Sequence, residues 1–74
     1  MEYKERIITD PNIMLGKPVI KGSRITVELI LRKLSEGMTI EEVLEAYPHL
    51  TKEDVLATFS YSADVISKEE LIAT

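Results

Sequence analysis

The sequence contains no cysteine and no tryptophan, and it has only one histidine and one phenylalanine. Without cysteine the chain cannot form disulfides, and His49 alone cannot supply the ligand set of a zinc site. The residues needed for nucleophilic catalysis are also missing. A nucleophile needs an activating base, but His49 follows Pro48 in a turn, and the serines and acids show no triad-like arrangement. We therefore expect no metal, no cofactor, no small-molecule substrate and no enzyme activity, and we interpret His49 as a solvated turn residue.

Long apolar runs are also missing. No segment approaches the roughly 20 apolar residues that span a bilayer. Residues 1–6 lack the basic start and the apolar stretch of a signal peptide. The lack of cysteine agrees with a reducing compartment. These absences predict a soluble, cytoplasmic protein with no membrane partner.

The chain of 74 residues has room for one domain, residues 1–74, and for only a small core. Domains of this size usually gain stability from disulfides, a metal or a partner. Since the first two are excluded, the sequence predicts self-association or a protein partner, with a homodimer as the default expectation.

Charge is distributed unevenly in a chain whose formal net charge is -4. Residues 1–37 carry seven basic and five acidic side chains, whereas residues 38–74 carry two basic and eight acidic ones. Such an asymmetry favours contact of the N-terminal half with something anionic. The alternative is that both halves are simply solvated, and the sequence leaves both interpretations open.

The first 25 residues have the features of an extended arm broken by turns. Residues 6–9 form a short β-branched run, which a turn signal at residues 10–12 ends. The pair at residues 19–20 follows Pro18, which suits the edge of a sheet better than its middle. We therefore predict a short N-terminal β segment over residues 1–25, with two strands.

From Thr26 onward the apolar period becomes helical. Thr26 is suited to cap the first helix, and Gly37 is suited to end it. Residues 39–42 form a capping box that starts a second helix, which Pro48 ends. The apolar positions of the first helix are Val27, Ile30, Leu31 and Leu34. A three-helix core over residues 26–66, followed by a tail over residues 67–74, makes the predicted fold class mainly α.

The third helix is predicted to run from about Lys52 to about Ile66, with Thr51 and Asp54 forming its cap. It carries two apolar stripes, although a lone surface helix needs only one. The stripe expected to pack on the first two helices is Val55, Leu56, Phe59, Ala63 and Ile66. The second stripe, together with Leu29 on the first helix, is expected to contact a partner: Ala57, Tyr61 and Val65. Alternatively, Tyr61 only covers a small core.

A basic segment at residues 16–25 precedes the first helix. Its cations Lys17, Lys21 and Arg24, with Arg32 and Lys33 from the first helix, are suited to contact phosphates. The alternative is a tight structural turn whose lysines are solvated.

The connection at residues 47–51 has the length of a helix-turn-helix motif, which makes the third helix a candidate recognition helix. Its first residues are Lys52, Glu53 and Asp54. Lys52 is a further candidate nucleic-acid contact, but the two acids oppose docking in the major groove.

Three runs of residues carry a family resemblance: GKPVIKGSRI, LSEGMTIEEVLEAYPHLTKEDV and FSYSADVI. In this order they resemble a widespread prokaryotic family catalogued as a domain of unknown function (DUF). The similarity covers residues 7–66. Family members more often have threonine where this chain has Ser23, which keeps the hydroxyl group. The signature positions of the resemblance are Gly16, Lys17, Pro18, Gly22 and Arg24.

The resemblance implies a homeodomain-like three-helix fold with an N-terminal strand segment. It also implies a VapB-type antitoxin that silences a PIN-like toxin and represses its own operon. Our leading hypothesis is therefore an antitoxin-like helix-turn-helix regulatory protein that acts as a dimer and binds double-stranded DNA, a PIN-like toxin or both. The alternative is a protein–protein adaptor or dimerisation module without a nucleic-acid role, which the acidic start of the third helix favours.

Overall fold

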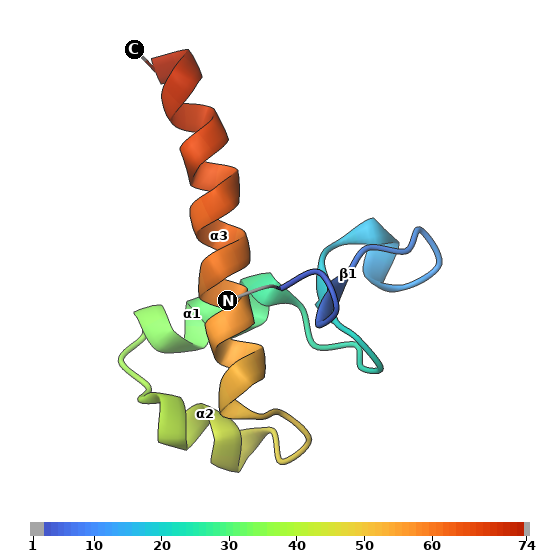
Figure 1. The fold of residues 1–74 in the computed structure, drawn as a ribbon. Coiled ribbons are helices and arrows are strands. Elements are labelled where there is room, and N and C mark those ends of the chain that lie inside the picture. The colour runs from blue at the N-terminus through green and yellow to red at the C-terminus, as the bar shows by residue number, and fades with distance from the viewer. Residues whose placement is uncertain (1–2, 74) are drawn as a thin grey trace.

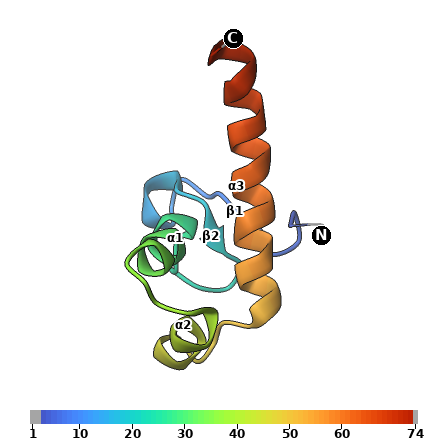
Figure 2. The ribbon, with the colours of Figure 1, turned by 90° about the vertical axis from the view of Figure 1, so that its left-hand side faces the viewer.

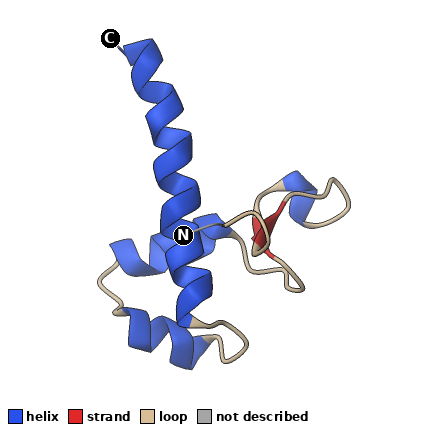
Figure 3. Ribbon diagram, in the orientation of Figure 1, coloured by secondary structure: helices blue, strands red, loops and turns tan. Residues whose placement is uncertain are grey.

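The fold is a three-helix domain with a short β segment at its N-terminus (Figures 1 and 3), as the sequence predicted. The computed structural model describes residues 3–73, and the side chains of residues 3–68. The elements follow in the order β1 (Ile7–Ile8), a 3-10 turn (Met14–Gly16), β2 (Val19–Ile20), α1 (Val27–Ser35), α2 (Ile40–Ala46) and α3 (Lys52–Ala73). None of the helices within the described residues is long and apolar enough to cross a membrane.

The two strands form an antiparallel pair in which Ile7 lies opposite Ile20 and Ile8 opposite Val19. Pro18 directly precedes β2, and its carbonyl accepts a hydrogen bond from the Val27 N–H at 2.9 Å. This bond joins the β segment to the first residue of α1. Because Val19 and Ile20 are buried, the β segment contributes one side of the core.

The turn at Met14–Gly16 has an uncommon backbone. Met14, Leu15 and Gly16 all have positive φ, at 50°, 57° and 82°. For residues with a Cβ atom this left-handed conformation costs roughly 1–2 kcal/mol each. Leu15 nevertheless lies at its tip with 93% of its surface exposed. The turn is therefore strained. The exposed Leu15 side chain gains no burial that would offset this strain.

Each helix begins at the threonine that the sequence indicated. The Thr26 hydroxyl oxygen accepts from the Leu29 N–H at 3.0 Å. Thr39 and Glu42 form the complete capping box of α2. In α3 the Thr51 hydroxyl oxygen accepts from the Asp54 N–H, while the Asp54 carboxylate accepts from the Thr51 N–H. These local bonds fix the N-terminal ends of the helices, of which α1 and α2, with 9 and 7 residues, would be marginal alone.

The core lies between the β segment, α1, α2 and the first half of α3. Its fully buried side chains include Val19, Ile30, Val43, Val55 and Thr58. Figures 1 and 2 show α3 continuing well past the other elements. It reaches Ala73, beyond the predicted end at about Ile66, and no glycine or proline interrupts the sequence after that residue.

The prediction of which α3 face packs on the core was wrong for all but one of its residues. Val55 is buried, but Leu56, Phe59, Ala63 and Ile66 are exposed. The buried face instead consists of Asp54, Val55, Ala57 and Thr58. The Thr58 hydroxyl donates to the Asp54 carbonyl at 3.1 Å. Because this local bond satisfies the hydroxyl, Thr58 can be fully buried in the core. Its polar side chain did not indicate a core position in the sequence.

Candidate functional site

An open groove of about 490 Å³ runs between α1 and α3. Most of its lining is apolar, and its wall on α3 lies where that helix leaves the core. The apolar side chains that line it are Pro18, Val27, Leu31, Tyr61, Val65 and Ile66. Glu28, Arg32, Ser35 and Ser62 supply its polar groups. A volume of this size is typical of binding sites, but the shape is that of a trough rather than an enclosed cavity.

The α1 side of the groove carries a small cluster of charges. One Glu28 carboxylate oxygen accepts from the Lys17 ammonium at 3.1 Å, and the other accepts from the Arg32 guanidinium at 3.1 Å. The hydrogen bond from Lys17, followed by that from Arg32, lowers the pKa of the Glu28 carboxyl. Two cations thus share one anion, which leaves this edge of the groove with a net positive charge.

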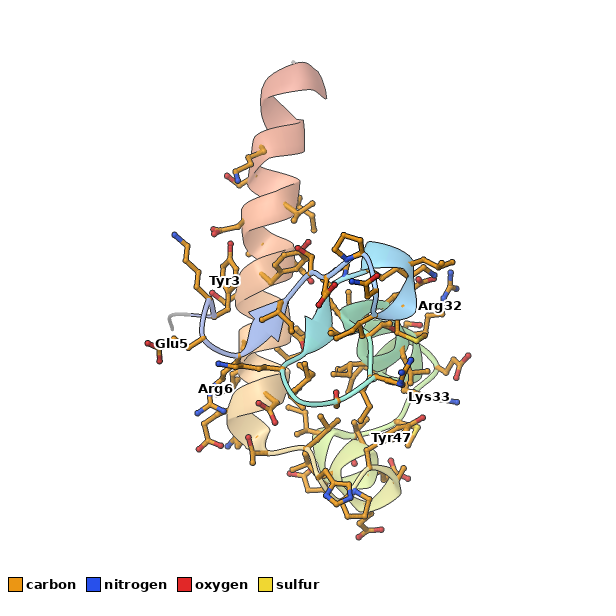
Figure 4. The ribbon with its side chains drawn as sticks, turned by 90° about the vertical axis from the view of Figure 1, so that its right-hand side faces the viewer. Tyr3, Glu5, Arg6, Arg32, Lys33 and Tyr47 are labelled. Carbon is orange, nitrogen blue, oxygen red and sulfur yellow. The ribbon has the colours of Figure 1, made fainter. Side chains whose placement is uncertain are left out.

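Contacts with the N-terminal arm hold Tyr61 in place at the groove. The Tyr3 and Tyr61 rings meet edge to face, with centroids 5.4 Å apart and planes at 89°. The Tyr3 hydroxyl donates to Asp64 at 2.9 Å. Figure 4 shows Tyr3 and Arg6 on the arm beside α3, whereas Arg32 and Lys33 lie on α1. The arm therefore fixes the α3 wall of the groove from the far side.

A second apolar surface lies on α3 outside the core. It consists of Leu56, Phe59, Ala63 and Ile66, all exposed, and is called the outer stripe below. None of the four belongs to the core cluster or to the side chains packed against it. The helical period predicted that these residues pack on the core, so this surface was not expected from the sequence. Their three- and four-residue spacing, which matches a coiled-coil seam, was the signal that pointed to it.

The predicted protein-interface residues separate into three environments. Ala57 is fully buried, with 0% of its surface exposed, so it cannot contact a partner and its assignment is corrected. Tyr61 is half-buried, because it packs against the core on one side and lines the groove on the other. Val65 is exposed and lines the groove, and Leu29 is half-buried on α1.

The predicted nucleic-acid contacts do not come from one element. Lys17 and Arg32 are both paired with Glu28 at the groove. Lys21 and Arg24 are exposed in the turn between β2 and α1, Lys33 is half-buried on α1, and Lys52 is exposed at the start of α3. These last four make no ion pair with the described side chains.

The surface of α2 and of the first turn of α3, the pair predicted to form a helix-turn-helix motif, is acidic. Glu41, Glu42 and Glu45 are exposed on α2, and Glu53 is exposed in the first turn of α3. Asp54 is buried there and binds Arg6 instead of facing outward. Phosphates repel exposed carboxylates, so α2 and α3 are poorly suited to the standard docking of this motif in the major groove.

Among the described side chains no group of three or more histidine, cysteine or acidic residues is arranged to hold a metal ion. The surface features of this small helical domain are the apolar groove and the exposed outer stripe. Residues 7–62 match the family described as "Protein of unknown function (DUF433)", and the chain belongs to this family. The predicted resemblance to a DUF family is thereby confirmed.

Two curated relatives are similar in sequence, and both are described only as uncharacterised. A protein of Sinorhizobium fredii, y4eO, is 30% identical over 59 residues, which is 80% of this chain and 27% of the relative. The chain thus spans about a quarter of that longer protein. A protein of Archaeoglobus fulgidus is 54% identical over 28 residues, covering 38% of this chain and 78% of the relative.

A solved structure shares the fold. The crystal structure of a DUF433 member protein from Anabaena variabilis superposes with a TM-score of 0.81 at 28% identity. The match covers 96% of this chain and 71% of that one. The arrangement of the arm and three helices is therefore common to family members of low sequence identity.

Proposed function

We propose that the chain is an antitoxin-like regulatory protein that acts by binding another protein in the groove between α1 and α3. The observation that carries this proposal is the groove itself, an apolar trough on a domain of 74 residues. An exposed apolar surface of this kind is a common mark of a protein contact. We also propose that the protein is not an enzyme and acts in the cytoplasm. The sequence has no cysteine, no triad-like arrangement of serines and acids around His49, and no apolar run long enough to span a bilayer.

The partner segment that suits this groove is an amphipathic helix with an acidic residue at its edge. Its apolar side would cover Leu31, Tyr61 and Val65, as helices do in apolar grooves. Its carboxylate would complement the surplus cation of the Lys17, Glu28 and Arg32 cluster. The antitoxin resemblance suggests a PIN-like nuclease as the protein that carries this segment.

The test uses the PIN-like nuclease encoded nearest to this chain in its own genome, with binding measured by calorimetry. Arg32→Glu and Val65→Glu should each weaken binding at least about tenfold, since each places a carboxylate on the partner's acidic or apolar side. Lys33→Glu is the matched control, because it makes the same charge change one residue away and outside the groove. Equal affinities of the groove variants and the wild-type chain would refute the proposal, as would a genome without such a nuclease.

DNA binding is a second candidate function, favoured by Lys21 and Arg24 in the turn between β2 and α1, which are exposed and form no ion pair with the described side chains. This turn lies outside the acidic surface of α2 and α3. Fluorescence anisotropy with DNA from the chain's own promoter should show binding that weakens with salt, because counterions are released. The double variant Lys21→Glu/Arg24→Glu should abolish it. No binding at low salt would remove this candidate.

A further inference from the structure

The α3 wall of the groove lies beyond the part of that helix which packs in the core. Among the described side chains, Thr58 is the last residue of α3 that is buried. The α3 residues that line the groove all follow it: Tyr61, Ser62, Val65 and Ile66. Helices in proteins gain most of their stability from tertiary packing, and this stretch has left the core. The position of the wall therefore depends on what holds α3 after Thr58.

Tyr3 of the N-terminal arm holds this stretch of α3 at two points. Its ring packs edge to face on the Tyr61 ring, with centroids 5.4 Å apart. Its hydroxyl donates to an Asp64 carboxylate oxygen at 2.9 Å. Both contacts lie on one side of α3, because residues three positions apart share a face of a helix. Tyr3 is not among the residues that line the groove, so it supports the wall without taking up the space of a partner.

The arm that carries Tyr3 is itself attached to the core. The Tyr3 carbonyl accepts from the Arg6 N–H at 2.9 Å and from the Ile7 N–H at 3.0 Å. Ile7 is buried and begins β1, which pairs with β2. The Arg6 guanidinium binds Asp54 in the first turn of α3 at 3.1 Å. The arm is therefore a fixed support, and Tyr3 joins it to the outer part of α3.

We propose that Tyr3 is a positioning residue of the groove. It keeps Tyr61 and the following turn of α3 in place, and attachment of the arm thereby raises the affinity of the groove for a partner. The affinity part of this inference rests on the proposed function, since it needs a helix bound in the groove. A wall that is already ordered loses less conformational entropy when a partner binds. The coupling is reciprocal, so a bound partner also favours attachment of the arm.

The free chain tests the positioning role without any partner. Because the sequence has no cysteine, two introduced cysteines would carry the only spin labels. Glu36→Cys at the end of α1 and Ser67→Cys on α3 are suitable, since both residues are exposed and do not line the groove. Pulsed electron paramagnetic resonance then measures the distribution of distances between the two helices. This distribution should be narrow with Tyr3 in place and clearly broader in Tyr3→Ala.

Two further variants separate positioning from a general loss of stability. Asp64→Ala removes the bond from the Tyr3 hydroxyl at an exposed residue of α3, so it should also broaden the distribution. Glu5→Ala is the matched control and should leave the distribution unchanged, because Glu5 is exposed on the same arm and points away from α3 (Figure 4). A distribution in Tyr3→Ala as narrow as in the wild type, or equal broadening in Glu5→Ala, would overturn the proposal. If Tyr3→Ala does not fold, a narrow distribution in Asp64→Ala overturns it instead.

Calorimetry with the PIN-like nuclease from the same genome tests the coupling. Tyr3→Ala should weaken binding about tenfold, a typical size for a coupling between sites, although Tyr3 does not line the groove. Glu5→Ala should bind like the wild type. In the complex, hydrogen exchange of the Arg6 and Ile7 amides should slow, since both donate to the Tyr3 carbonyl.

The outcomes distinguish this inference from the proposed function. Unchanged affinity of Tyr3→Ala, beside weakened binding of Val65→Glu, would overturn the coupling and leave the proposed function in place. A wild-type chain that does not bind the nuclease would refute the proposed function and the coupling with it. The spin-label distances would still decide whether Tyr3 positions the α3 wall.

Discussion

Arg6 and Asp54 are 48 residues apart in the chain, yet the Arg6 guanidinium lies 3.1 Å from an Asp54 carboxylate oxygen. The other oxygen accepts from the Thr51 N–H at 3.0 Å. A single carboxylate therefore closes the first turn of α3 and fastens the N-terminal arm to it. This double role explains why the acidic side chain of Asp54 is buried beside the core.

Replacing Asp54 by alanine should lower the free energy of unfolding by about 2 kcal/mol, because both the cap and the arm contact are lost. Glu53→Ala is the control, since Glu53 is exposed in the same helical turn and should change stability by less than about 0.5 kcal/mol. Urea denaturation measures both. Similar midpoints for the two variants would contradict the role assigned to Asp54.

The environments of Ala57 and Ala63 predict opposite responses to a larger side chain. Ala57→Leu should destabilise the fold by about 1–3 kcal/mol, because there is no space for three more carbon atoms at a fully buried site. Ala63→Leu should leave the thermal midpoint of the monomer almost unchanged, since Ala63 is exposed. Thermal unfolding at low protein concentration compares them, and a stable Ala57→Leu chain would place the core elsewhere.

The strained turn at Leu15 should be improved by a residue that tolerates left-handed backbone. Leu15→Asn is expected to raise the free energy of unfolding by about 0.5–1 kcal/mol, since asparagine is enriched in this region. Leu15→Ala tests the cause, because it removes the exposed apolar side chain but keeps the Cβ atom. If urea denaturation shows that Leu15→Asn and Leu15→Ala raise the free energy of unfolding equally, relief of backbone strain is not the reason for the gain in stability.

The pKa of Glu28 should depend on its two cations. Lys17→Met removes the larger contribution and should raise this pKa toward the ordinary value of a glutamate. Because the folded-state pKa is lowered, the stabilisation by this group is present above its unfolded-state pKa and is lost as pH falls through the folded value. NMR titration of the carboxyl group measures the shift. The shift should shrink in high salt, since the cluster is exposed, and an unchanged pKa in Lys17→Met would refute the assignment.

Local sequence signals predicted the helices well. Thr26, Thr39 and Thr51 mark helix starts through bonds to residues three positions away, so no tertiary information is needed to find them. The two strands in the N-terminal arm were expected from turn signals of the same local kind, whereas the pairing of residues 7–8 with 19–20 comes from the structure. The three left-handed residues at the turn were not predicted, because Met14 and Leu15 have no intrinsic preference for that conformation.

The orientation of α3 could not be predicted for a different reason. A helical period shows that two apolar stripes exist, but it does not show which of them faces the core. Thr58 and Asp54 made the buried face look polar, and the contact of Asp54 with Arg6, 48 residues away, is visible only in the fold. The outer stripe was mistaken for the core side because it has the larger apolar residues.

The edge-to-face pair of Tyr3 and Tyr61 gives the chain an intrinsic optical label. With no tryptophan in the sequence, three tyrosines supply nearly all of its near-ultraviolet signal. Fixed packing of aromatic rings produces near-ultraviolet circular dichroism, and loose packing abolishes it. Attachment of the arm to α3 can therefore be followed in the unmodified protein, separately from the helical signal in the far ultraviolet.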